Sequence, residues 1–223
     1  EGLRAVRRPT SRGAPLRPSR ARAPSGGPTP RRGSFRPTDP AQRSRTRAGG
    51  PGGSGVPTSI DAAIFDAAMD ASVTLDMDAV MKSLNLEAGY TGTLTQGVND
   101  ITINTTATLA GGTFTGGTGD IAVEDDFELS GTTFTSTSGT LDLKEDFIHT
   151  SGTFAHNNGT VKFSGASGIP QEIAGSSTTN FNDILVTNVS STPGVRVQSN
   201  KNLQGVLTLG SNVVFDADGS TNS

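Results

Sequence analysis

Residues 111–165 contain nearly the same sequence three times: GGTFTGGTGDIAVEDDFEL (111–129), SGTTFTSTSGTLDLKEDFIH (130–149) and TSGTFAHNNGTVKFSG (150–165). Equivalent residues recur at intervals of 20, in the sets Phe114, Phe134 and Phe154, and Gly119, Gly139 and Gly159. A fixed period of this size is typical of repeat architectures in which each unit packs on its neighbours. The repeat therefore determines the fold class.

Within each copy, apolar and polar residues alternate, which predicts short β-strands. Ile121 and Val123 precede an acidic corner, Phe127 and Leu129 follow it, and Phe134 lies in a third apolar stretch. Three strands and three corners in 20 residues predict one rung of an all-β, parallel β-helix (β-solenoid), and the rule for parallel crossovers favours a right-handed coil. A β-sandwich is the alternative, but the strict 20-residue spacing, glycines included, favours the helix.

Stacking of equivalent positions would place neighbouring rungs about 4.8 Å apart in parallel sheets. Like side chains would then form interior ladders, and we expect two of them: Leu94, Phe114, Phe134 and Phe154, and Ile101, Ile121, Leu141 and Val161. The repeated glycines are expected at a corner with positive φ, which glycine adopts without steric cost.

The composition suits a narrow solenoid better than a globule with a large core. Hydrophobic residues make up 32% of the chain, aromatic residues 5%, and there is no Trp. A solenoid that buries only a thin column of side chains can be built from such a sequence.

Charge divides the chain into two segments. Residues 1–55 hold 13 Arg, no Lys and two acidic residues, a net charge of +11, whereas residues 56–223 hold 5 basic and 19 acidic residues, a net charge of −14. Residues 1–55 are rich in Pro and Gly with little apolar surface, so we predict a disordered basic leader. Its Arg residues could bind a polyanion. The segment lacks an interleaved series of aromatic residues for base stacking, so we do not expect nucleic acid as the partner.

Residues 56–223 are predicted to form the β-helix domain. Residues 56–72 would be an atypical first rung or a cap, because a solenoid needs its terminal apolar face covered. The Ala-rich stretch 61–69 is compatible with a short helix or with a strand.

Rung length is expected to vary outside the three best copies. The pair Leu84 and Leu86 precedes the pair Ile101 and Ile103 by only 17 residues, which indicates a shorter step there. Strand-like sequence continues to Phe215, and we count roughly seven rungs in all.

Several classes of site and segment are excluded by the sequence. The chain has no Cys, so it holds neither a disulfide nor a thiolate site. It has no apolar run long enough for a membrane span and no signal peptide. It begins at Glu1 rather than Met and stops just after a strand-like run, so we expect it to be a piece of a longer protein.

One corner of the repeat collects carboxylates. A period of 20 places Asp125 over Glu145 and Asp126 over Asp146. Like charges about 5 Å apart repel, and a hard cation with oxygen ligands would relieve the repulsion. We therefore name these four residues as a candidate Ca²⁺ site and predict no other cofactor. The alternative is that the carboxylates are simply hydrated, with Glu124 and Lys144 as a cross-rung ion pair.

The two histidines predict no catalytic site. His149 aligns with Leu109 and Leu129, which indicates a wall position, and His156 lies at a corner. No Ser or Asp stands in a triad relation to either histidine. We therefore predict that the chain is not an enzyme and name no catalytic residue.

A polysaccharide lyase or hydrolase on the same fold is the enzymatic alternative. It would need carboxylates with a Lys or Arg base on one exposed sheet. Lys144, Lys162 and the acidic residues within 142–146 come nearest to that requirement.

Five segments together resemble secreted bacterial β-helix repeat proteins of the adhesin and autotransporter-passenger kind: VPTSIDAAIFDA (56–67), MKSLNLEAGYTGTLTQG (81–97), GGTFTGG (111–117), SGTFAHNNGTVKFSG (151–165) and QEIAGSSTTNFNDILVTN (171–188). The resemblance covers about residues 56–215. It implies an extracellular or bacterial cell-surface location and a structural stalk or adhesin-like display module. The implied partners are surface glycans, other surface proteins and neighbouring rungs of a longer chain.

Overall fold

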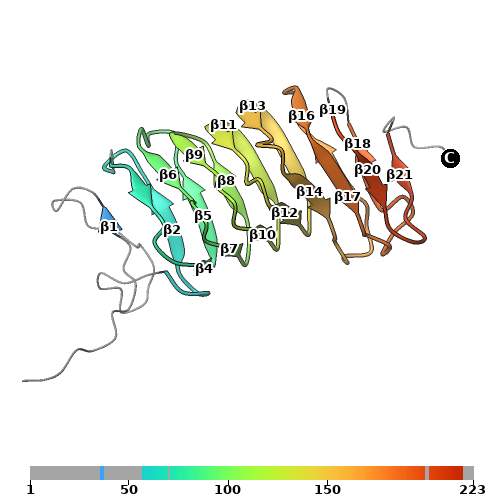
Figure 1. Cartoon of the computed structure of the whole chain (residues 1–223), viewed down its shortest axis with the longest axis horizontal. Coiled ribbons are helices and arrows are strands. Elements are labelled where there is room, and N and C mark those ends of the chain that lie inside the picture. Colours follow the sequence, from blue (N-terminus) through green and yellow to red (C-terminus); the bar gives the residue numbers. More distant parts are fainter. Residues whose placement is uncertain (1–35, 38–56, 70, 199–200, 218–223) are drawn as a thin grey trace, which may run out of the picture. The chain divides into compact units, whose positions relative to one another are not determined.

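The computed structural model describes residues 36–37, 57–69, 71–198 and 201–217. The described chain is all-β, without a helix, and its parallel sheets stack into a β-solenoid of about seven turns with about 21 residues per turn. Figure 1 shows the strands following one another along a single axis from β2 to β21. The predicted parallel β-helix is confirmed. The predicted disordered leader, residues 1–55, lies outside the described residues except for strand β1 (Arg36–Pro37).

Each turn contributes strands to three faces, and each strand pairs with its equivalents in the turns before and after it. The first face consists of β2 (Ala62–Phe65), β5 (Ser83–Leu86), β8 (Ala107–Leu109), the first halves of β11 (Phe127–Thr135) and β13 (Phe147–Ala155), β15 (Gln171–Ala174), β18 (Val195–Val197) and β21 (Phe215–Asp216).

The second face follows the first within each turn. It consists of β3 (Val73–Thr74), β6 (Thr93–Thr95), β9 (Thr113–Thr115), the second halves of β11 and β13, and then the paired strands β16 (Thr179–Phe181) and β19 (Lys201–Leu203). Strand β1 pairs with β3 in the antiparallel direction, unlike the other described pairs.

The third face is a continuous seven-stranded parallel sheet. It consists of β4 (Ala79–Met81), β7 (Ile101–Ile103), β10 (Ile121–Val123), β12 (Thr140–Leu143), β14 (Thr160–Phe163), β17 (Asp183–Val186) and β20 (Leu207–Leu209).

The corner between the first and second faces differs from the expected turn. Strand β11 runs through the segment 130–132 without a break and shifts register against β13 on both sides of Ser130. Such irregularities bend a strand. The chain therefore passes from one face to the next by bending a nine-residue strand.

The interior is made of the predicted ladders. Phe114, Phe134 and Phe154 pair in register and stack, with ring centroids 4.8 and 5.7 Å apart. Phe127 and Phe147 form a parallel stack beside them at 5.4 Å. The Ile101, Ile121, Leu141 and Val161 ladder is likewise in register and buried. Offset stacked rings add to the stabilisation that comes from burial alone.

The repeated glycines serve a different purpose from the one expected. Gly119, Gly139 and Gly159 do not have positive φ, so that prediction is wrong. A Cβ at Gly119 or Gly159 would instead lie well inside van der Waals contact of a carbonyl oxygen in the preceding turn, that of Asn99 or Thr137. Glycine is required because neighbouring turns approach closely at this corner.

The step between turns varies, but around residues 79–109 it is longer than in the centre, at 22–23 residues, and not shorter as the sequence indicated. Leu84 pairs with Ala107 on the first face, so the proposed alignment of Leu84 and Leu86 with Ile101 and Ile103 is wrong. The step is 20 residues in the centre, whereas Phe147 pairs with Ile173, 26 residues later.

The segment 56–72 is described from residue 57, apart from residue 70. It supplies β2, which pairs in register with β5 and buries Ala63 and Phe65. The Ala-rich stretch therefore contributes a strand of the first turn and does not form a helix. The described residues contain no helix that could span a membrane.

Candidate functional site

The acidic corner lies between the third and first faces, where the chain leaves β10 and β12. Asp126 Oδ1 accepts a hydrogen bond from the backbone N–H of Asp146 at 3.0 Å, and Asp146 Oδ1 accepts one from the N–H of Glu172 at 2.8 Å. Asp125 Oδ2 accepts a hydrogen bond from the hydroxyl of Thr106 at 3.1 Å. These carboxylates therefore join each turn to the next.

At the corner that precedes the third-face strands, aspartate side chains again accept hydrogen bonds from the backbone of the next turn. Asp78, Asp100 and Asp120 each accept the backbone N–H of the equivalent residue one turn later, at 2.9, 2.8 and 2.7 Å. Hydrogen bonds to a charged acceptor are stronger than those between neutral groups. Aspartate at these corners is thus explained by the stacking of turns.

The four predicted calcium ligands do not form a ligand set. Among the described residues, no three carboxylate or imidazole side chains are grouped so that they could hold a metal ion. Burial raises the pKa of Asp146, and the nearby charges of Asp126, Glu172 and Glu145 raise it further. The predicted repulsion is present, but Asp126 and Asp146 are directed to backbone N–H groups and Asp125 to the Thr106 hydroxyl.

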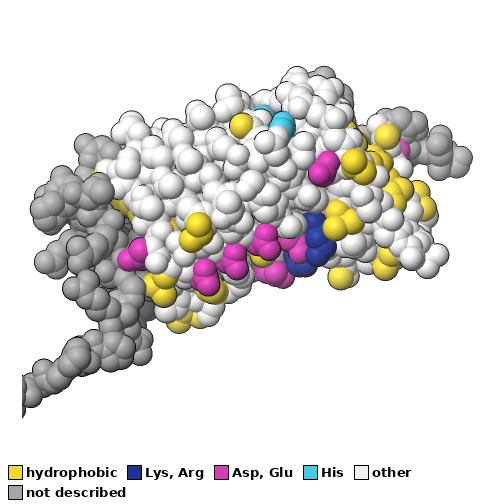
Figure 2. All heavy atoms as spheres, in the orientation of Figure 1, with side chains coloured by type: hydrophobic (Ala, Val, Ile, Leu, Met, Phe, Trp, Pro, Cys, Tyr) yellow, Lys and Arg dark blue, Asp and Glu magenta, His cyan; other side chains and the backbone are white. Residues whose placement is uncertain are grey.

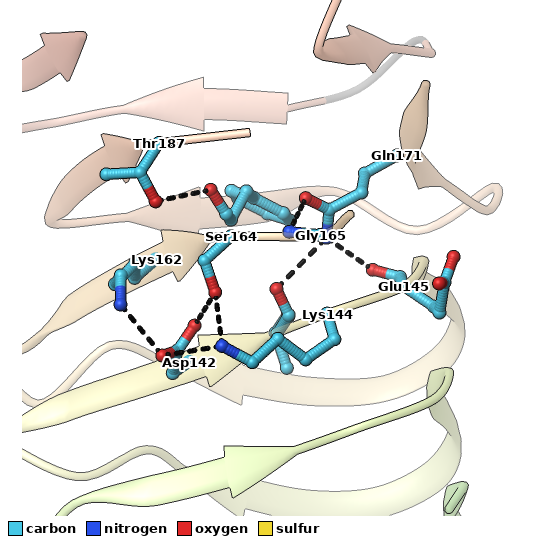
Figure 3. A network of polar contacts seen from close by, with 10 residues as sticks. Asp142, Lys144, Glu145, Lys162, Ser164, Gly165, Gln171 and Thr187 are labelled. Atoms are coloured by element: carbon cyan, nitrogen blue, oxygen red, sulfur yellow. Dashed lines mark hydrogen bonds and ion pairs between the residues drawn. The ribbon is translucent and has the colours of Figure 1, made fainter. Parts of the chain in front are cut away.

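The third face carries the densest charged cluster, and Figure 3 shows how its side chains converge. Asp142 on β12 and Lys162 on β14 are neighbours in register, with Lys162 Nζ 2.9 Å from Asp142 Oδ2. Lys144 Nζ lies 3.4 Å from the same oxygen and donates to Ser164 Oγ at 2.8 Å. Ser164 donates in turn to Asp142 Oδ1. We call these four residues the Asp142 cluster.

The Asp142 cluster is a closed network. Burial alone would raise the pKa of Asp142, but hydrogen bonds from Ser164 and Lys162 and the charges of both lysines outweigh it and lower the pKa. A carboxylate with a lowered pKa and both oxygens occupied is a weak general base. The cluster also lacks the second carboxylate that glycoside hydrolysis requires.

The cluster corrects one predicted contact. Lys144 pairs with Asp142, two residues earlier on the same side of the chain, and no ion pair with Glu124 is found in the described part. The sequence had grouped Lys144, Lys162 and the acids at 142–146, and the structure brings Asp142 and both lysines together.

Beside the cluster lies a buried amide network that the sequence did not reveal. Gln171 Nε2 donates to the carbonyls of Leu143 and Glu145 at 3.0 and 2.9 Å, and its Oε1 accepts the N–H of Gly165 at 2.8 Å (Figure 3). Asn188, also buried, donates to the same Oε1 at 3.2 Å. The network satisfies backbone groups where the 26-residue step interrupts the regular stacking.

His149 occupies the wall position that the sequence predicted. It pairs in register with Leu129, is buried, and places Nδ1 2.9 Å from Thr179 Oγ1. Its Nε2 is buried without a hydrogen-bond partner among the described residues. Burial lowers the pKa of His149, and the charge of Lys201 acts in the same direction. A neutral, enclosed imidazole has no access to a substrate.

The second face presents a regular array of threonines. Thr93, Thr95, Thr113, Thr115, Thr133, Thr135 and Thr153 flank the inward Leu94 and Phe ladder and stack in register on β6, β9, β11 and β13. We call these seven residues the threonine grid. Its two rows repeat every rung, about 4.8 Å, and lie about 6–7 Å apart along the strand. The sequence shows the repeated T-x-T motif and predicts Thr- and Ser-rich outer faces available to carbohydrate, but it does not show which hydroxyls lack partners.

The hydroxyls of the threonine grid are not used to hold the turns together. None of them makes a hydrogen bond within the described part of the chain, whereas the hydroxyls of Thr105, Thr132 and Thr137 bind carbonyls of the preceding turn. In the view of Figure 2 the surface over these strands carries few charged side chains, while acidic side chains gather along the opposite side. The grid is therefore a flat, neutral surface of methyl and hydroxyl groups.

Comparisons with protein-family models, with curated proteins and with solved structures gave no match. The fold and the geometry described above are therefore the basis for inferring function.

Proposed function

We propose that this chain is a non-enzymatic β-solenoid segment that acts as a stalk or adhesin-like display module of a larger secreted or cell-surface protein. The observation that carries the proposal is a difference between two groups of polar side chains, those that bind other turns and those that do not. Those at the corners and in the interior bind neighbouring turns, whereas the threonine grid offers a regular set of hydroxyls without a hydrogen-bond partner among the described residues. The resemblance to bacterial surface repeat proteins points in the same direction.

A flat hydroxyl surface suits a neutral ligand. Sugar rings present hydroxyls at their edges and C–H groups on their faces, and each threonine offers both a hydroxyl and a methyl group. Affinity for a single sugar would be low, because exposed hydroxyls gain little over water. A polymer could contact several rungs at once and gain avidity. Surface polysaccharides are therefore the proposed partners.

Retention of the chain on immobilised polysaccharides tests this proposal. We expect binding without depolymerisation, and loss of binding in the double variant Thr113→Val and Thr115→Val, which removes two hydroxyls but keeps the β-branched shape. Thr102→Val is the matched control, since Thr102 lies on β7 of the third face. Equal binding by both variants, or no retention of the wild type on any polysaccharide, would refute a role for the grid.

The enzymatic alternative rests on the Asp142 cluster, which groups one carboxylate with two lysines on an exposed sheet. A screen for turnover of acidic polysaccharides tests it. Turnover that is abolished by Asp142→Asn would replace the stalk proposal with a catalytic one. Polyanion binding through residues 1–55 is the third class of function, and DNA retention that depends on salt and is lost on deleting those residues would support it.

A further inference from the structure

The turn that contains β13 and β14 is joined unequally to the turn of β15, β16 and β17. On the third face β14 pairs with β17 through the four residues Thr160–Phe163, and on the first face β13 pairs with β15 through two, Phe147 and Ile148. On the second face β13 pairs with β11 and β16 pairs with β19, and within the described residues no ladder joins β13 to β16. Figure 1 shows these two strands in successive turns. We call the contact between β13 and β16 the joint.

Side chains take the place of the missing ladder at the joint. His149 Nδ1 lies 2.9 Å from Thr179 Oγ1, and both residues are buried, at 1% and 0% exposure. The carbonyl of His149 accepts a hydrogen bond from the N–H of Ser177 at 3.0 Å. Phe154 and Phe181 contact each other across the same step, with ring centroids 5.6 Å apart. The joint therefore depends on His149 through both its backbone and its imidazole.

A charge on the imidazole of His149 would find no counter-charge. The two strands that pair with β13 carry one acidic residue each, Glu128 on β11 and Glu172 on β15, and both occupy outward positions that alternate with the buried ones. Strand β14 carries Lys162, which is held in the Asp142 cluster, and β16 carries no titratable residue. Lys201 on β19 is a cation. The described strands around His149 therefore offer it repulsion and no carboxylate.

These surroundings make the closed joint sensitive to acid. Burial lowers the pKa of His149, and the charge of Lys201 acts in the same direction. An imidazole that is released into water regains its ordinary pKa of about 6.5. Because the closed state has the lower pKa, it is fully stable above about pH 6.5 and loses stability as the pH falls below that value.

We propose that the joint is an acid-sensitive hinge: protonation of His149 separates β13 from β16 on the second face, while β14 and β17 stay paired on the third. The hinge side is secured by the β14–β17 ladder and by Gln171, whose amide binds carbonyls of the preceding turn. Opening exposes Phe154 and Phe181, which are 9% and 0% exposed in the closed joint. Hinge motion of this kind needs only a few residues to change conformation. The hinge does not depend on whether the threonine grid binds polysaccharide.

Asp146 also spans this step, but its titration has the opposite sign. Asp146 Oδ1 accepts the N–H of Glu172 at 2.8 Å. Burial raises the pKa of Asp146, and neighbouring carboxylates raise it further. A carboxyl group whose pKa is raised in the folded state favours that state as the pH falls through the raised value. Asp146 therefore does not predict opening in acid, and His149 does.

Paired nitroxide labels across the joint test the proposal, and the absence of Cys allows their placement. Thr153→Cys and Asn180→Cys occupy outward positions on β13 and β16. We expect dipolar broadening between the labels at about pH 7.5 and its loss towards about pH 5, with the ratio of open to closed joints rising up to about tenfold per pH unit below about 6.5. The matched control pair, Thr113→Cys and Thr133→Cys, spans a continuous ladder and should stay broadened at both values.

Residues that do not titrate at position 149 identify the group responsible. With His149→Leu or His149→Gln, the Thr153–Asn180 labels should stay broadened at about pH 5, whereas His156→Gln should behave like the wild type. Circular dichroism melts at about pH 7.5 check that each variant is folded, and the glutamine variant retains a polar group next to Thr179 should the leucine variant not fold. The proposal is overturned if the labels across the joint do not separate in acid, if both label pairs lose their broadening together, or if the separation persists without His149.

Discussion

The central turns and the last turn are built from the same alternation of residues but differ in what covers them. In the centre, Phe134 lies between Phe114 and Phe154 and is 2% exposed. In the last described turn, Leu207 pairs among the described strands with Ile184 alone, and it is 36% exposed. A turn of this solenoid is therefore stable because of the turns on both sides, as expected for a repeat protein whose stability is a sum of neighbour interfaces.

The largest expected effect comes from placing a charge in the two regions. Phe134→Asp buries a carboxylate without a partner, at a cost of at least several kcal/mol, which is comparable with the total stability of a typical domain. We predict loss of the folded state, measured by circular dichroism. Leu207→Asp, on the last described strand of the third face, should keep a cooperative melt. A soluble Phe134→Asp variant that melts cooperatively would contradict the ladder.

Gln171 tests whether the long step is held by its amide network. Gln171→Leu leaves the carbonyls of Leu143 and Glu145 and the N–H of Gly165 without their partner. At about 1–3 kcal/mol for each buried group left unsatisfied, we expect the free energy of unfolding to fall by at least about 3 kcal/mol. Urea denaturation measures it. Gln198→Leu, at an exposed position, is the control and should change stability by less than about 0.5 kcal/mol.

His149 links the centre to the C-terminal turns and should make stability depend on pH. Burial lowers its pKa in the folded state, and the charge of Lys201 acts in the same direction. The unfolded chain takes up this proton near pH 6.5, and the folded chain does so only at lower pH. Stability is therefore complete above about pH 6.5 and falls as the pH drops below it.

Melting temperatures between about pH 4.5 and 7.5 measure this dependence. We predict that His149→Leu, which restores the residue type of Leu109 and Leu129, removes the decline below about pH 6.5. The control variant His156→Gln should retain it. An unchanged pH profile in His149→Leu would show that another group is responsible.

The smallest expected effect concerns the Asp142 cluster. The pKa of Asp142 is lowered, so its stabilising contribution is present above the ordinary value of about 3.9 and is lost as the pH falls through the lower, folded-state pKa. Solvent screens the cluster, because its charged side chains remain 20–31% exposed. Asp142→Asn should therefore lower the melting temperature at pH 7 only slightly. The same melts in high salt should reduce the difference further. A loss as large as that of Gln171→Leu would contradict this assignment.

The regular part of the fold was predictable because one period governs backbone and side chains together. The spacing of Phe114, Phe134 and Phe154 determines which residues pair between turns, which side chains point inward and on which face they lie. Three copies were therefore enough to predict the ladder. Leu84 was assigned to the wrong face because alternation identifies a strand but not which of three faces it occupies. The sequence identified the repeated glycines but not why glycine is required there, because the close approach of neighbouring turns is visible only once the turns are stacked.

The candidate sites were less predictable for a related reason. The sequence placed Asp126 beside Asp146 in the next turn, in agreement with the hydrogen bond between them, but it could not show to which donors these carboxylates are directed. The role of Gln171 was hidden because the 26-residue step removes it from the period that made the other positions readable. The threonine grid does follow the 20-residue period. Its threonines differ from others because their hydroxyls have no hydrogen-bond partner among the described residues, and that can be seen only in the structure.

Hydrogen exchange of the native chain tests the central claim most directly. Amides of β9 to β12 should be strongly protected, because described turns cover them on both sides. Amides of β19 to β21 should exchange faster, because a described turn covers them on one side only. Equal protection of both regions, or rapid exchange in the centre, would contradict the account.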